Sequence, residues 1–159
     1  MYIDPFGLDG INIHYDSYPV TVPGTDSSLP LGHAGVVAVN PETGATRYYE
    51  YGRYDSDFGN VERRKIPDVV IGSDGLPTES SLQKLYDYLS KHYGKNSPIT
   101  AEYYPDADYQ SIIDFAERLM NDPNREPYSW YPWDSNHCKD FANDAISGAR
   151  PKSAWGWGW

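Results

Sequence analysis

The sequence is poor in cysteine, in basic residues and in long apolar runs. A single cysteine among 159 residues excludes an internal disulfide and any zinc site built from several cysteines. No stretch has the apolar length of a signal peptide or a membrane span, so we expect a soluble domain that binds no membrane. With 13 Lys and Arg against 23 Asp and Glu, the net charge of −10 disfavours binding to nucleic acid, because phosphates require clustered positive charge.

The chain is long enough for one compact domain with its own core, and we expect it to be a monomer. Tyrosine is abundant, with 15 residues, and such side chains can bury the ring while the hydroxyl keeps a hydrogen-bond partner. A core of this composition therefore combines apolar packing with internal hydrogen bonds.

The one cysteine, Cys138, lies at the predicted start of a helix. Apolar residues follow it at helical spacing: Phe141, Ala142, Ala145 and Ile146. Three residues that can cap a helix N-terminus precede it: Asp134, Ser135 and Asn136. The dipole and the unpaired N–H groups of a helix start favour a thiolate and can stabilise an oxyanion. This placement is typical of a cysteine nucleophile, although a lone cysteine is also commonly a small buried hydrophobe.

A histidine and a carboxylate on two predicted strands far upstream are candidate partners for this thiol. His33 begins an apolar, β-branched stretch over residues 33–39, and a turn leads to a second strand over 46–53 that holds Glu50. Glu50 could accept the imidazole N–H and fix its tautomer, while His33 serves as the base for the cysteine. Alternatively, Glu50 is a solvated edge residue or the partner of Arg47 or Arg53.

Two other residues compete with Glu50 for the orienting role. Asp55 follows the same strand, and the amide of Asn136 is close to Cys138 in sequence. His137 directly precedes the cysteine, but neighbouring residues on a helix point about 100° apart, so we expect a capping or surface role for it. Chemistry of this kind requires no metal and no cofactor.

The remaining pattern predicts an α+β fold in which a small antiparallel sheet packs against about three helices. Besides the segments already named, we expect two short strands within 11–22, strands over 68–72 and 99–104, and helices over 77–94 and 109–120. Gly94 is predicted to cap the first of these helices in a left-handed conformation. The basic run at 63–65 is predicted to be a solvated loop.

The first residues resemble a known junction. Tyr-Ile-Asp-Pro-Phe-Gly-Leu, ending at Leu8, is similar to the Asp-Pro-x-Gly-Leu motif that ends the shell-forming core of Rhs repeat proteins. This resemblance implies that residues 1–8 are the remnant of a self-cleavage junction and that 9–159 form a toxin domain with a cognate immunity protein. An ordinary turn made by the proline and glycine is the alternative.

The order of the three candidate residues resembles that of circularly permuted papain-like hydrolases, relatives of the NlpC-type peptidoglycan peptidases. The motifs are His33 in His-Ala-Gly-Val-Val, Glu50 in Tyr-Tyr-Glu-Tyr-Gly-Arg-Tyr and Cys138 in Asn-His-Cys-Lys-Asp-Phe-Ala. The resemblance implies a permuted papain-like fold in which Cys138 attacks an amide or ester carbonyl. His33 then acts as base and acid, and Glu50 orients it.

Three functions are compatible with these residues. The first, which we favour, is a cysteine peptidase delivered into a rival bacterium, where it cleaves a protein. The second is a peptidoglycan amidase or endopeptidase with the same three residues, although an acidic chain is less suited to an anionic polymer. The third is a non-catalytic binding module rich in tyrosine and tryptophan, in which His33 and Cys138 belong to the core.

Overall fold

The computed structural model describes residues 8–21, 27–29, 32–52, 60–124 and 138–151. Its strands are β1 (Leu8–Tyr15), β2 (Val20–Thr21), β3 (Ser28–Leu29), β4 (His33–Val39), β5 (Thr46–Gly52), β6 (Asn60–Arg64) and β7 (Ile99–Asp108). Its helices are α1 (Glu79–Tyr93), α2 (Tyr109–Met120) and α3 (Cys138–Ala149). None of these helices combines the length and apolar character that a membrane span requires.

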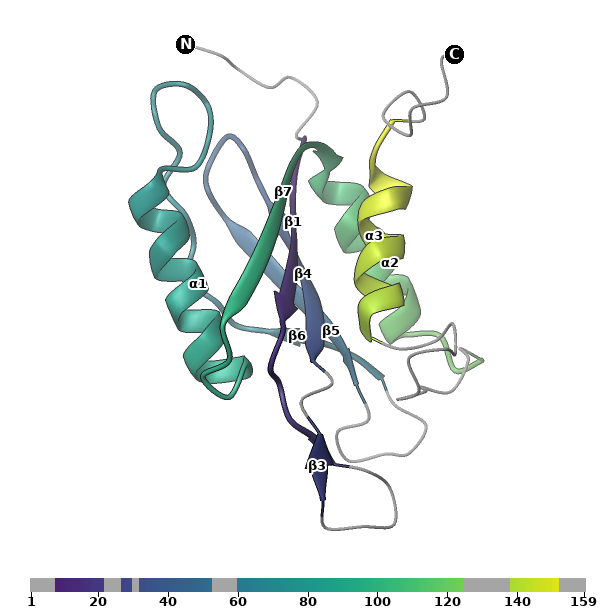
Figure 1. Cartoon of the computed structure of the whole chain (residues 1–159). Coiled ribbons are helices and arrows are strands. Elements are labelled where there is room, and N and C mark those ends of the chain that lie inside the picture. Colours follow the sequence, from purple (N-terminus) through teal and green to yellow (C-terminus); the bar gives the residue numbers. More distant parts are fainter. Residues whose placement is uncertain (1–7, 22–26, 30–31, 53–59, 125–137, 152–159) are drawn as a thin grey trace.

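Five antiparallel strands form the central sheet in the order β6-β5-β4-β1-β7, and β2 pairs with β3 separately. Helix α1 covers one face of the central sheet, whereas α2 and α3 cover the other (Figure 1). The central strand β4 is buried along its whole length, as expected for a strand with helices on both sides. The predicted α+β class, a small antiparallel sheet packed against three helices, is confirmed.

The alternation of side chains along the strands divides the core into two clusters. Even-numbered residues of β4, such as Val36, pack with α2 and α3. Odd-numbered residues, such as Val37, pack with α1. The same rule places His33 on the α1 face, together with the side chains that β5 contributes at even positions.

The predicted helix over 77–94 is present as α1, but its end differs from the prediction. Thr78 caps the start by accepting a hydrogen bond from the backbone N–H of Ser81. Gly94 has φ −106°, so the left-handed cap predicted there is wrong; Lys95 and Asn96 instead adopt positive φ. The left-handed backbone conformation after α1 therefore begins at Lys95, one residue after the predicted position at Gly94.

Two other predictions are wrong in detail. The segment 68–72 forms no strand, because Ile71 makes only an isolated bridge with Pro77. The basic run predicted as a loop includes the end of strand β6, where Arg63 and Arg64 pair with β5. This pairing brings an arginine next to the α1 face of the sheet.

Candidate active site

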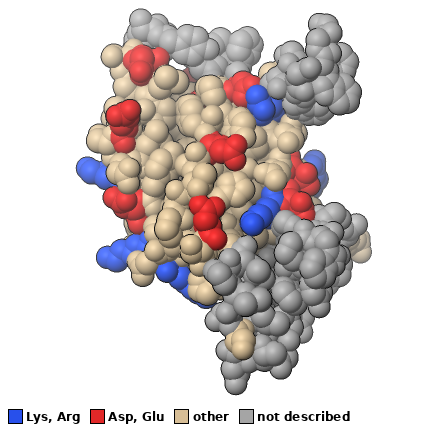
Figure 2. All heavy atoms as spheres, in the orientation of Figure 1, with Lys and Arg blue, Asp and Glu red and all other residues tan. Residues whose placement is uncertain are grey.

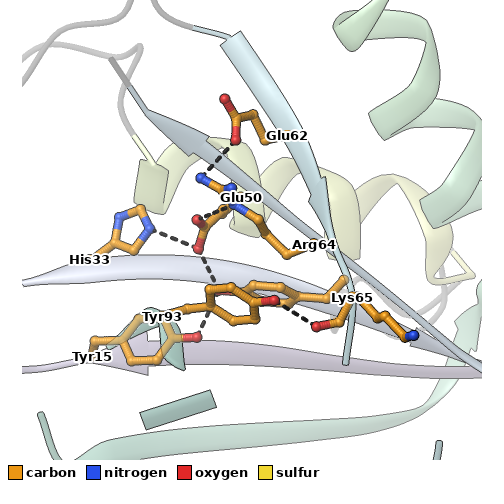
Figure 3. Close-up of polar contacts among 8 residues, drawn as sticks. Tyr15, His33, Glu50, Glu62, Arg64, Lys65 and Tyr93 are labelled. Atoms are coloured by element: carbon orange, nitrogen blue, oxygen red, sulfur yellow. Dashed lines mark hydrogen bonds and ion pairs between the residues drawn. The ribbon is translucent and has the colours of Figure 1, made fainter. Parts of the chain in front are cut away.

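His33 and Glu50 lie on neighbouring strands and on the same face of the sheet. The register pairs Gly35 of β4 with Glu50 of β5, so His33, two residues earlier, is the diagonal neighbour of Glu50. His33 Nε2 lies 3.2 Å from Glu50 Oε2, and both side chains are buried (Figure 3). Strand pairing alone therefore positions the carboxylate against the imidazole.

Two further side chains donate hydrogen bonds to the Glu50 carboxylate. The Tyr48 hydroxyl donates to Oε2 over 2.9 Å, and Arg64 Nε donates to Oε1 over 3.3 Å. Arg64 also binds Glu62 through Nη2, at 2.7 Å, which fixes the guanidinium (Figure 3). Donated hydrogen bonds and a neighbouring positive charge favour the ionised form of a carboxylate that is only 4% exposed.

Cys138 is the first residue of α3 and is 5% exposed. Its side chain lies within hydrogen-bonding reach of His33. The structure thus brings together all three residues selected from the sequence, with His33 between the thiol and the carboxylate.

The surroundings of His33 stabilise its protonated form. Burial lowers the pKa of His33, but hydrogen bonds to Cys138 and Glu50, together with their negative charges, outweigh it and raise the pKa from 6.5 to about 10. At neutral pH such an imidazole holds its proton, and the N-terminus of α3 favours the negative charge on Cys138. The arrangement therefore favours a thiolate–imidazolium pair.

Two tyrosine rings pack against the imidazole. Tyr15 stacks on His33 with ring centroids 5.7 Å apart and an interplanar angle of 15°, and Tyr18 lies 4.9 Å away at 38°. Tyr15 reaches this position because the register pairs it directly with His33. The rings restrict the orientation of the imidazole and shield it from water.

Asp55, Asn136 and His137 lie outside the described residues, as do the predicted capping residues Asp134 and Ser135. Within the described part of the chain, no three His, Cys, Asp or Glu side chains are grouped so that they could hold a metal ion.

Sequence reasoning missed two members of this cluster, Tyr48 and Arg64. The signal for Tyr48 was available, because it stands two residues before Glu50 on one strand and must share its face. Arg64 requires the β5–β6 register, which pairs it with Tyr48. That register cannot be read from the sequence, because the connection over residues 53–59 is too long for a tight turn that would fix the pairing.

The fold and the site together define the class of protein. It is an α+β domain that buries a thiol, an imidazole and a carboxylate, with the thiol at the N-terminus of a helix and the other two groups on neighbouring strands. A family model for TseH-like type VI secretion system effectors matches residues 8–154, so the chain belongs to this family. The predicted role as a bacterial effector is confirmed at this level.

A solved structure supports the same assignment. The chain is similar to the crystal structure of the type VI secretion system effector TseH, with a TM-score of 0.77 and 33% sequence identity. The match covers 92% of this chain and 78% of the TseH chain. No curated protein matches the sequence.

Proposed function

We propose that this effector is a cysteine hydrolase that cleaves an amide bond in a target bacterium. One observation carries the proposal: His33 lies between Cys138, at the N-terminus of α3, and Glu50, whose Oε2 is 3.2 Å from His33 Nε2. A nucleophile, a proton donor and an orienting carboxylate are what amide hydrolysis by a thiol requires.

In the first half of the reaction, the Cys138 thiolate forms a bond to the carbonyl carbon of the substrate. The oxygen of the tetrahedral intermediate takes up the negative charge, and backbone N–H groups at the start of α3 stabilise it. His33 gives its proton to the amine as the C–N bond breaks, which leaves an acyl group on sulfur.

In the second half, neutral His33 accepts a proton from water as the water attacks the thioester. The C–S bond breaks, the carboxylic acid leaves, and the thiolate–imidazolium pair forms again. Glu50 keeps the imidazole in place throughout and stabilises its positive charge.

The charge of the chain favours a protein substrate over peptidoglycan. The net charge is −10, and acidic and basic side chains are interspersed over the face in Figure 2, without a large basic surface among the described residues there. A polymer with its own negative charge gains little from such a surface. Peptide bonds in the wall remain the second substrate class, which the experiment below distinguishes.

The proposal includes delivery into the target cell and a cognate immunity protein in the producing cell. The effector family supports delivery, and the Rhs-like junction predicted at residues 1–8 supports the immunity protein. The division into this junction and a hydrolase domain over 9–159 belongs to the same proposal.

Growth of cells that express the chain tests the function. The wild-type chain should arrest growth when directed to the compartment that holds its substrate, and Cys138→Ala should abolish the arrest at equal expression. A chain toxic only in the periplasm, with cleaved muropeptides, indicates wall peptides; toxicity in the cytoplasm indicates a protein substrate.

His33→Ala and His14→Ala form a matched pair of controls. His14 lies on the neighbouring strand β1 and pairs with Glu102, outside the cluster. We expect His33→Ala to be harmless to the cell and His14→Ala to stay toxic. Growth arrest by folded Cys138→Ala would overturn the hydrolase and would favour a binding module.

A further inference from the structure

Beyond the three residues, we propose that Tyr48 is a positioning residue, which holds the Glu50 carboxylate charged and aimed at His33. The inference rests on the proposed function and assigns Tyr48 no contact with substrate. Tyr48 is fully buried on β5, two residues before Glu50 and on the same face of the sheet.

The two oxygens of the Glu50 carboxylate are held by different side chains. Tyr48 donates to Oε2, and this is the oxygen that faces His33 Nε2 at 3.2 Å. Arg64 holds the other oxygen, Oε1. With Tyr48 in place, Oε2 is fixed in the direction of the imidazole; without it, the carboxylate can turn toward Arg64.

The direction of the tyrosine hydrogen bonds follows from the number of protons available. The Tyr15 and Tyr48 hydroxyl oxygens are 2.7 Å apart, and either could donate. Because the single Tyr48 proton goes to the carboxylate, Tyr15 must donate to Tyr48. Burial and the charge of Glu50 raise the pKa of Tyr48 well above 10, so its hydroxyl remains a donor in neutral and mildly alkaline solution.

Gly35 gives an independent reason to regard this placement as specific. A Cβ on Gly35 would overlap the hydroxyl and the ring of Tyr48, which lies across β4 at this point. Gly35 also pairs directly with Glu50 in the sheet register. The glycine in His33-Ala-Gly35 thus leaves the space through which Tyr48 reaches the carboxylate.

The adjacent Tyr49 is a matched control. It is also fully buried on β5, but it belongs to the opposite cluster, with Val36 and Ala38, away from His33. Tyr49→Phe and Tyr48→Phe therefore remove the same atom from the same strand, and only the second touches Glu50.

Alkylation of Cys138 tests the proposal without any substrate. Cys138 is the single cysteine, so the rate of iodoacetamide addition can be followed by intact mass from pH 4 to pH 10. In the wild type we expect fast reaction at pH values well below the pKa of a free thiol, about 8.5. The acid limb of this profile is the pH range in which the rate falls because the thiolate takes up a proton. In Tyr48→Phe, Glu50 no longer holds the imidazolium firmly against Cys138, so the thiolate is less stabilised and the acid limb should move up by about one pH unit.

Gly35→Ala should move the acid limb in the same direction, and Tyr49→Phe should leave it unchanged. Folding is checked by circular dichroism first; if Tyr48→Phe does not fold, Tyr15→Phe removes the donor behind it and should give a smaller shift in the same direction. If folded Tyr48→Phe keeps the acid limb of the wild type, the positioning role is overturned, but the proposed function is not. The same holds for folded Tyr15→Phe if Tyr48→Phe does not fold. Reaction of the wild type like a free thiol overturns the proposed function as well.

Discussion

The two faces of the central sheet differ in what they bury. The face under α2 and α3 is packed mainly with apolar side chains, such as Val36, Ile112 and Phe141. The face under α1 also buries apolar residues, but beside them it holds the charged and hydrogen-bonded pair His33 and Glu50. The sheet therefore separates a mainly apolar face from a face that holds the base and the carboxylate, and Cys138 meets His33 from the start of α3.

Buried charge is tolerated on the α1 face only because each group has partners. An isolated carboxylate or imidazolium in the interior would be strongly destabilising, whereas a paired and fully hydrogen-bonded one is not. Glu50 has His33, Tyr48 and Arg64 as partners. Apart from those at Cys138, substitutions on the two faces should consequently affect different properties: activity on the α1 face and stability on the face under α2 and α3.

The largest effect is expected from Glu50→Gln on the α1 face. Glutamine keeps the shape but removes the charge that stabilises the imidazolium, so turnover should fall by roughly two to four orders of magnitude while the chain stays folded. The measurement is substrate cleavage, or growth arrest where no substrate is known.

Asp55→Asn and Asn136→Ala, measured in parallel, rank the rival residues. We expect both to retain most of the activity. Full activity of Glu50→Gln with a collapse in either rival would reassign the orienting role, and full activity in all three would leave a dyad of Cys138 and His33.

A smaller effect, and one of a different kind, is expected on the other face. Ile112 is fully buried between α2 and the sheet, and Ile112→Ala should lower the free energy of unfolding by about 2–5 kcal/mol. The folded fraction should keep wild-type turnover. Urea unfolding gives the first quantity and turnover per folded molecule the second; a loss of turnover in fully folded Ile112→Ala would show that the faces are not separate.

Much of the fold could be predicted because local patterns determine it. Helix α2 covers the predicted residues 109–120, because the spacing of Ile112, Ile113 and Ala116 is helical and little in the segment competes. The apolar run after His33 predicts a buried strand for the same reason.

The predictions that are wrong concern segments whose structure depends on pairing with other parts of the chain. Asp68–Gly72 has the composition of a strand but finds only one bridging partner, Pro77 opposite Ile71. The sequence predicts a solvated loop for Arg64, whereas the β5–β6 register places it beside Tyr48 and Glu50. The proximity of Cys138 to His33 was inferred from chemistry, since nothing in the spacing of residues 33 and 138 requires it.

The charge state of His33 is the central property of the proposed site. Nitrogen-15 chemical shifts of the four histidines, assigned with His33→Gln, give its titration in the resting protein. We predict that His33 remains an imidazolium through pH 8, titrates with a pKa of about 10, and loses part of this elevation in Cys138→Ala, where Glu50 remains. A neutral His33 at pH 7.5 in the folded wild type, with a pKa near 6.5, would contradict the thiolate–imidazolium pair.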